Sequence, residues 1–88
     1  MNMRKMQVLL VTSTDCHLCE HARRVLACMA QRYPLSVSEV LWASEEGRRL
    51  AARDGIVFPP GVYLDGSFWG YGRLSEGRLE KWLREQRA

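Results

Sequence analysis

The spacing of hydrophobic residues changes several times along the chain, and each spacing predicts a different element. Met6–Thr12 is almost continuously apolar, as expected for a central strand that is covered on both faces. From His17 to Tyr33, apolar residues recur every three or four positions, which predicts a helix with one buried stripe. The stripe comprises Leu18, Ala22, Val25, Leu26, Met29 and Tyr33. Pro34 is expected to end this helix.

The middle of the chain predicts a second strand and a short amphipathic helix. Residues 35–42 are rich in valine and leucine but are interrupted by polar side chains, so we expect an edge strand. Ser44 is a suitable N-cap for the helix, because its hydroxyl can accept a backbone N–H and the next two residues are acidic. Leu50 and Ala51 would give this helix a thin apolar face, and Gly55 is suited to end it.

The last third of the chain predicts a hairpin followed by a helix. Residues 62–64 form a short apolar strand, and residues 67–71 form the returning strand. The Asp65-Gly66 pair between them is a strong signal for a two-residue turn. Ser75 can cap the final helix. The buried stripe of that helix comprises Leu79, Trp82 and Leu83.

Three aromatic residues lie close together on the returning strand. Trp69 and Tyr71 alternate with Phe68, so a period of two places the first two on one face and Phe68 on the other. One of these faces should be core. We therefore interpret the aromatic stripe as packing rather than as a binding platform.

The predicted order is strand, helix, strand, helix, strand, strand, helix. The first two strands must be parallel and joined by a right-handed crossover, whereas the last two form an antiparallel hairpin. This order predicts an α/β fold with a four-stranded mixed sheet flanked by helices. The length of 88 residues suits a single domain that spans positions 1–88.

Composition narrows the possible function classes. The net charge is +3, but the arginines are scattered, so a solvated surface is a better interpretation than a nucleic-acid patch. The longest apolar run near the N-terminus is too short to cross a membrane. That run has no cleavage site of small residues after it, so we expect no export signal and a reducing, cytoplasmic location. Cys28 is then expected to be a free, buried thiol.

The segment Cys16-His17-Leu18-Cys19 joins the first strand to the first helix. A C-x-x-C pair at such a junction is a redox motif, because two sulfurs on one helical turn can close and reopen a disulfide. The N–H groups of the helix N-terminus favour thiolate, which is the form that attacks a disulfide. Cys16 lies off the apolar stripe and should be exposed, whereas Cys19 lies at its edge and should be half buried.

Neighbouring polar residues suggest how this motif is capped and tuned. Ser13, Thr14 and Asp15 are candidate N-caps for the helix. A protonated His17 would stabilise the Cys16 thiolate, whereas the Asp15 carboxylate would oppose it unless it caps the helix.

A metal site is the competing interpretation of the same segment. Cys16, His17, Cys19 and His21 supply four soft ligands within six residues. Cys16 and His17 point about 100° apart on a helix, so one ion cannot easily take all four. A partial site made by the two cysteines and completed by a second molecule would hold zinc, copper or an iron–sulfur centre. His21 is otherwise interpreted as a partly packed surface residue.

With its C-H-L-C segment after the first strand and Pro60 shortly before the Asp65-Gly66 turn, the chain resembles the thioredoxin fold. It is more closely similar to small glutaredoxin-like bacterial proteins with a Cys-His-Leu-Cys active site. The resemblance implies that Cys16 is the nucleophile and that Cys19 resolves the mixed disulfide. It also implies a cis peptide bond before Pro60, with Pro59 as the alternative cis residue.

Three departures from the glutaredoxin pattern put the use of glutathione in doubt. The family's lysine before the first cysteine is replaced here by Asp15. Pro59 precedes the expected cis proline and has no N–H to offer a substrate. Arg73 stands near the position of the family's aspartate, so it would repel an ammonium group and attract a carboxylate.

The resemblance implies a thiol–disulfide oxidoreductase that takes part in electron transport. Its expected partners are a protein or small-molecule disulfide as substrate, and a thiol or a flavoprotein as reductant. Pro59, Pro60 and Arg73 are the predicted substrate-binding residues. No separate cofactor, nucleic acid or membrane partner is expected, and the chain is expected to be a monomer.

Overall fold

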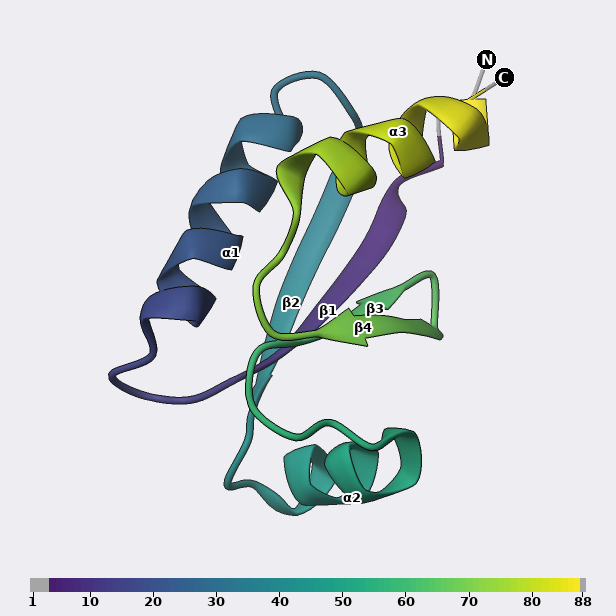
Figure 1. The fold of residues 1–88 in the computed structure, drawn as a ribbon. Helices are drawn as coiled ribbons and strands as arrows, with labels where there is room; N and C mark the ends of the chain where they lie inside the picture. Colours follow the sequence, from purple (N-terminus) through teal and green to yellow (C-terminus); the bar gives the residue numbers. More distant parts are fainter. Residues whose placement is uncertain (1–3, 88) are drawn as a thin grey trace.

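The computed structural model describes residues 4–87, which form four strands and three helices in the predicted order (Figure 1). The elements are β1 (Met6–Thr12), α1 (His17–Met29), β2 (Leu35–Leu41), α2 (Glu45–Asp54), β3 (Gly61–Leu64), β4 (Ser67–Tyr71) and α3 (Glu76–Arg87). None of the described helices is long and apolar enough to cross a membrane.

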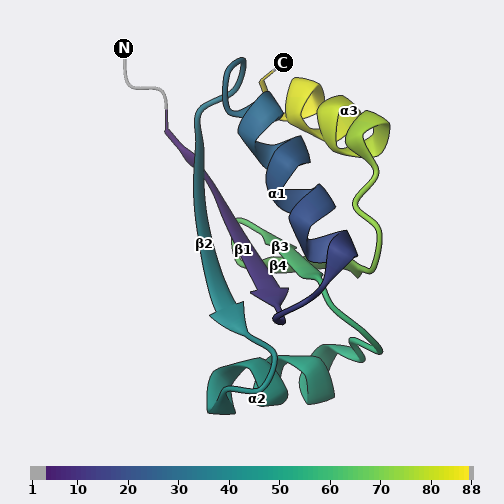
Figure 2. The ribbon, with the colours of Figure 1, turned by 90° about the vertical axis from the view of Figure 1, so that its left-hand side faces the viewer.

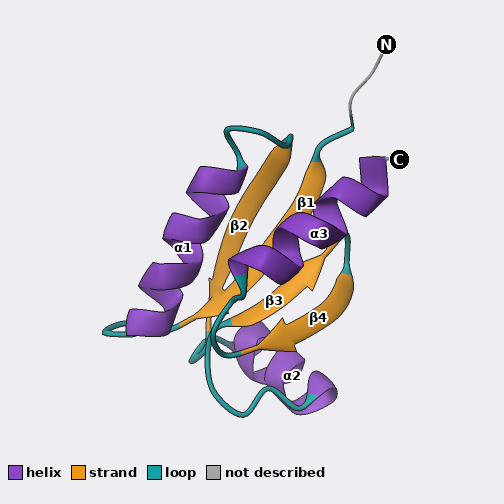
Figure 3. Cartoon of the chain, turned by 45° about the horizontal axis from the view of Figure 1, so that its top comes forward, coloured by secondary structure: helices purple, strands orange, loops and turns teal. Residues whose placement is uncertain are grey.

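The four strands form one mixed sheet in the order β2-β1-β3-β4 (Figure 3). β1 is parallel to β2, whereas β3 is antiparallel to both β1 and β4. The predicted parallel first pair, the hairpin and the edge position of β2 are therefore confirmed.

The two faces of β1 explain why helices cover both sides of the sheet. Val8 and Leu10 face the larger core, which they share with α1 and α3, and Val11 faces a smaller core under α2. Because successive side chains of a strand point to opposite faces, a continuously apolar strand needs cover on both. Figure 2 shows α1 and α3 on one side of β1 and β2, with α2 at the end where both strands finish.

Helix α1 ends at Met29, so the predicted extension to Tyr33 is wrong. The N–H groups of Arg32 and Tyr33 both bond to the Met29 carbonyl oxygen, which makes a tight turn after the helix. Pro34 disfavours helical backbone at the preceding residue. The Tyr33 side chain is nevertheless buried in the larger core, which is why it fits the helical stripe.

Cys28 is exposed, which corrects the prediction of a buried thiol. It lies two residues beyond the buried Leu26, about 200° around the helix axis. The buried stripe of α1 therefore points to the sheet while Cys28 points to solvent.

A bulge in the hairpin corrects the predicted faces of the aromatic residues. Tyr63 pairs with Phe68, but Val62 pairs with Gly70, so Trp69 is an extra residue in β4. The extra residue shifts the alternation by one position. Phe68 and Tyr71 consequently lie on the same face, and Trp69 packs against the larger core on the other.

Candidate redox site

Cys16 and Cys19 form a disulfide at the start of α1, with their Cα atoms 5.2 Å apart. Cys16 is partly exposed, as expected for a residue off the apolar stripe. Cys19 is 0% exposed, so it is more deeply buried than the predicted half-buried position. The reason is that Cys19 precedes Ala22 by almost one helical turn, and Ala22 faces the larger core.

Cys16 is itself the N-cap of α1, which corrects the expectation that Ser13, Thr14 or Asp15 caps the helix. Its backbone is extended, with φ −119° and ψ 104°, and its Sγ accepts the N–H of Cys19 at 3.1 Å. The positive φ of 52° at Asp15 turns the chain just before the cap. The sulfur therefore occupies the position that an oxygen acceptor usually fills at a helix start.

This capping geometry has a chemical consequence for the reduced protein. A sulfur at a helix N-terminus faces unpaired N–H groups and the positive end of the helix dipole. Both favour a negative charge on Cys16 over a neutral thiol. Cys19 is buried and lacks this position.

The predicted tuning residues, His17 and Asp15, both lie at the surface next to Cys16. The His17 side chain is 100% exposed, and its Nδ1 lies 3.9 Å from a carboxylate oxygen of Glu20. The ionic contact of His17 is therefore with Glu20 on the surface of α1. The influence of His17 and Asp15 on the sulfurs stays a prediction.

The Pro59–Pro60 peptide bond is cis, so Pro60 is the cis residue that the resemblance implies. Gly61 follows this bond and pairs with Val11 of β1. The end of β1 that leads to Cys16 and the proline loop therefore leave the sheet at the same end. The carbonyl oxygen of Pro60 accepts the N–H of Gly72 at 2.8 Å, which ties the loop to the end of β4.

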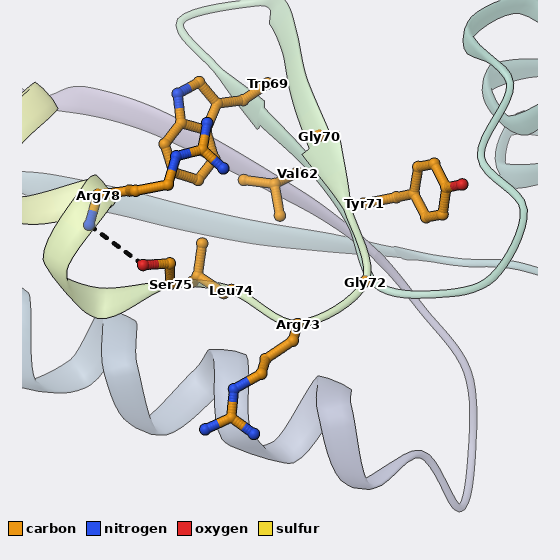
Figure 4. Close-up of a pocket in the computed structure, with 9 residues that line it drawn as sticks. All are labelled: Val62, Trp69, Gly70, Tyr71, Gly72, Arg73, Leu74, Ser75 and Arg78. Atoms are coloured by element: carbon orange, nitrogen blue, oxygen red, sulfur yellow. Dashed lines mark hydrogen bonds between the residues drawn. The ribbon is translucent and has the colours of Figure 1, made fainter.

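Arg73 is exposed and lies in the connection from β4 to α3 (Figure 4). It lines an open pocket of about 250 Å³ together with His21, Leu74, Ser75 and Glu76. The Nε2 atom of His21 lies 3.2 Å from the Leu74 carbonyl oxygen, at hydrogen-bond distance. His21 is therefore a partly packed surface residue, as predicted.

The competing metal interpretation needs several donors around one point. Within residues 4–87, no group of three or more His, Cys, Asp or Glu side chains is arranged to hold a metal ion. His21 faces the Leu74 carbonyl, and His17 faces Glu20. The four donors of the segment do not gather in this conformation.

An ion-pair network near the end of β1 was not foreseen from the sequence. The buried Thr12 hydroxyl donates to Glu39 at 3.0 Å, and Arg23 of α1 makes two hydrogen bonds to the same carboxylate at 2.8 and 2.9 Å. The Arg23 bonds hold the pKa of Glu39 below its usual value, against the opposing effect of burial. The network links α1, β1 and β2 beside the redox site; its sequence signal is only a charged residue inside an apolar strand.

Exposed aromatic residues beside the proline loop were also missed. Phe58 and Tyr71 are 48% and 41% exposed, and their rings meet edge to face with centroids 5.2 Å apart. The sequence did contain a signal for this exposed pair. Val57 and Phe58 are apolar, yet they lie in a segment that is predicted to be neither helix nor strand.

No protein-family model and no curated protein matches this chain. A mutant thioredoxin from Halobacterium salinarum NRC-1 has a similar structure, with a TM-score of 0.67 and 19% identity over 93% of this chain and 74% of that one. A thioredoxin from Thermus thermophilus matches with a TM-score of 0.59 and 21% identity, over 96% of this chain and 75% of that one.

A structure of the first two thioredoxin domains of Naumovozyma dairenensis Eps1p matches with a TM-score of 0.53 and 16% identity, over 93% of this chain and 35% of that one. At these identities the likeness concerns the fold. This chain therefore has a thioredoxin-like fold with a C-x-x-C cysteine pair at the start of α1.

Proposed function

We propose that this chain is a thiol–disulfide oxidoreductase in which Cys16 attacks and Cys19 resolves. The observation that carries the proposal is the unequal exposure of the two bonded sulfurs, with Cys16 accessible and Cys19 completely buried. An attacking sulfur must reach the disulfide of another molecule. A resolving sulfur needs to reach only the first cysteine.

The reaction starts from the reduced protein. The Cys16 thiolate attacks one sulfur of a substrate disulfide, so that a Cys16–substrate bond forms and the other substrate sulfur leaves as thiolate. Cys19 then loses its proton and attacks Cys16, which releases the second substrate thiolate and closes the Cys16–Cys19 disulfide. The substrate gains the two electrons that the cysteine pair loses.

The surroundings of the pair support this sequence. The Cys19 N–H that contacts the Cys16 sulfur would stabilise a thiolate there before it attacks the substrate. We assign His17 and Asp15 opposite electrostatic effects on this thiolate. Pro59, Pro60 and Arg73 form the substrate side of the site in this proposal.

The proposed cycle also defines its partners. A thiol or a flavoprotein must reduce the Cys16–Cys19 disulfide after each turnover, because each turnover takes two electrons from the cysteine pair. The proposed cycle uses no other cofactor. It requires only one copy of the chain. It includes a cytoplasmic location, since the reduced form is the one that attacks.

The test compares reduced wild type with Cys16→Ser in the reduction of a model disulfide. We expect wild type to react and Cys16→Ser to lose nearly all of the rate, as measured by the appearance of free substrate thiol. Cys28→Ser is the matched control, because Cys28 is an exposed thiol outside the site, and it should keep the wild-type rate. Equal rates for wild type and Cys16→Ser would contradict the proposal.

A further inference from the structure

The exposed aromatic pair formed by Phe58 and Tyr71 borders the proline loop. The Phe58 ring lies directly over Gly72, where an added Cβ would come within 3.0 Å of its Cε1 atom. The Gly72 N–H in turn bonds to Pro60. Gly72 and Pro60 are themselves buried, so the exposed surface at this end of the sheet is formed by the aromatic pair that lies over them.

The aromatic pair stays exposed although a hydrophobic core that could bury it lies nearby. The smaller core under α2 contains Val11, Leu50, Ile56 and Tyr63, but neither Phe58 nor Tyr71 belongs to it. Val57, next in the chain, is 67% exposed. A group of large apolar side chains in water beside a reactive centre is typical of a binding surface.

The opposite side of Gly72 carries a positive charge. Figure 4 shows the side chains of Tyr71 and Arg73 pointing to opposite sides of the chain at Gly72, with Arg73 directed toward α1. Among residues 4–87 no ion pair involves Arg73, and the acidic side chain that lines its pocket is Glu76. The surface is thus apolar on one side of Gly72 and cationic on the other.

The two prolines of the loop offer a passing chain no backbone N–H donor. Neither Pro59 nor Pro60 has an N–H, and the Pro60 carbonyl oxygen already accepts the N–H of Gly72. Strand-like backbone pairing at this loop is therefore reduced. Selectivity must come mainly from the side chains on either side of Gly72.

We infer that the preferred substrate is a disulfide-bonded polypeptide that crosses Gly72 with an apolar side chain on one side of its reacting cysteine and a carboxylate on the other. The apolar side chain packs on Phe58 and Tyr71, and the carboxylate faces Arg73. The inference rests on the proposed function, and it adds a substrate class without adding a covalent step.

The test measures single-turnover rate constants of the reduced protein with short peptides whose one cysteine is disulfide-linked to 2-mercaptoethanol. The cysteine is flanked by leucine and glutamate in both orders, and matched peptides replace leucine by serine or glutamate by glutamine. In the favoured order, we expect loss of the leucine to slow the reaction about tenfold. Loss of the glutamate charge should slow it about threefold, as for an exposed ion pair.

Variants assign each preference to a side chain. Phe58→Ser should abolish the preference for leucine, and Arg73→Glu should reverse the preference for glutamate over glutamine. The far-UV circular dichroism spectrum and the urea unfolding midpoint of both variants should match those of wild type, which shows that they are folded. Val37→Ser on β2 and Arg84→Glu on α3 remove an exposed apolar group and an exposed charge elsewhere, and should keep both preferences.

The outcomes separate the two proposals. Equal rates for all peptides, with Cys16-dependent reduction of bis(2-hydroxyethyl) disulfide, would overturn the substrate class and leave the oxidoreductase proposal intact. No Cys16-dependent reduction of any disulfide would overturn both. A dimer in sedimentation that Phe58→Ser dissociates would show that a second copy occupies the aromatic pair, and would also overturn the inferred substrate class.

Discussion

At the scale of single residues, Cys16 and Cys19 differ because a helix start leaves one sulfur in contact with solvent and turns the next toward the core. Cys16 combines partial exposure with the N-cap position, whereas Cys19 is sealed beneath it. The same three-residue spacing thus gives two sulfurs with different access and different local electrostatics. This difference predicts different outcomes for substitution of each one.

Cys19→Ser should convert the catalyst into a trap. Without the second sulfur, the mixed disulfide between Cys16 and a peptide thiol has no internal route to release. In a Cys28→Ser background, which removes the exposed third thiol, we expect a covalent adduct of one peptide per chain, detected by mass spectrometry under non-reducing conditions. Cys16→Ser should give no such adduct at Cys19, because that sulfur is buried; rapid adduct formation there would contradict the assigned roles.

Gly47 and Gly77 form a matched pair of helix glycines. A Cβ on Gly47 would lie 2.0 Å from the Leu41 carbonyl oxygen, whereas one on Gly77 meets nothing within 4 Å. Gly47→Ala should therefore lower the free energy of unfolding by roughly 3 kcal/mol. Gly77→Ala should raise it by about 0.5 kcal/mol through helix propensity. Urea unfolding measures both; equal effects would show that the α2–β2 approach is looser than described.

Some single positions could not be placed from the sequence. The faces of Trp69 and Tyr71 depend on one bulge residue, and an extra residue leaves no mark in an alternating pattern that is already short. Cys28 was misplaced because its type favours burial, although its angle on α1 points away from the sheet. The residue type of Cys28 favours burial, whereas its position on α1 favours exposure, and the structure follows the position.

At the scale of elements, two polar contacts fix helices to the sheet. Arg23 and Glu39 connect α1 to β2, with Thr12 of β1 bonded to the same carboxylate. Tyr63 of β3 donates its hydroxyl proton to Asp54 at the end of α2, with an O–O distance of 2.6 Å. Each contact makes a pH-dependent contribution to the free energy of unfolding. The contribution of the Glu39 contact is lost in acid, and that of the Tyr63 contact is lost in alkali.

Glu39→Gln should lower the free energy of unfolding by about 0.5 kcal/mol at neutral pH, because the ion pair is partly exposed. The folded state lowers the pKa of Glu39, so its contribution is present above the ordinary value of 4.5 and is lost as the pH falls through the lowered value. The difference between wild type and Glu39→Gln should therefore vanish in acid. Denaturant unfolding at several pH values tests this, with the exposed Glu85→Gln as control; a constant difference would contradict it.

Tyr63→Phe should cost about 1 kcal/mol by removing the bond to Asp54. Burial and the adjacent Asp54 carboxylate raise the pKa of Tyr63 from 10.0 to about 12. The unfolded chain therefore ionises first, and wild type should lose stability as the pH rises from 10 toward 12. The Tyr63→Phe variant lacks this loss, so plots of the free energy of unfolding against pH should converge for the two proteins at high pH. A constant difference between the two plots would exclude the effect.

Element types were more predictable than their ends. The apolar run of β1, the Ser44 cap of α2 and the Asp65-Gly66 turn each rest on a local rule that the structure keeps. The end of α1 was wrong because Tyr33 stays in the core after the helix has stopped. A stripe of apolar residues indicates which side chains face the core. It does not indicate whether the backbone at each of those residues is still helical.

At the scale of the whole molecule, the prediction succeeded because two faces of one strand require two layers of helices. The continuous apolar character of β1 predicts cover on both sides, and the structure has a larger core under α1 and α3 and a smaller one under α2. The site surface was less predictable. It combines residues from the β1–α1 loop, the proline loop and the end of β4, and only the sheet order brings those three segments to one end.

The solvent position of Cys28 makes the redox state of the whole molecule countable by mass. In the oxidised chain this is the one cysteine outside the disulfide, so iodoacetamide should add a single group. After gentle reduction Cys16 should add a second, and the buried Cys19 should add a third when urea opens the fold. Steps of one, two and three labels would give the fraction of oxidised molecules in any sample without a dye, an enzyme or a spectroscopic probe.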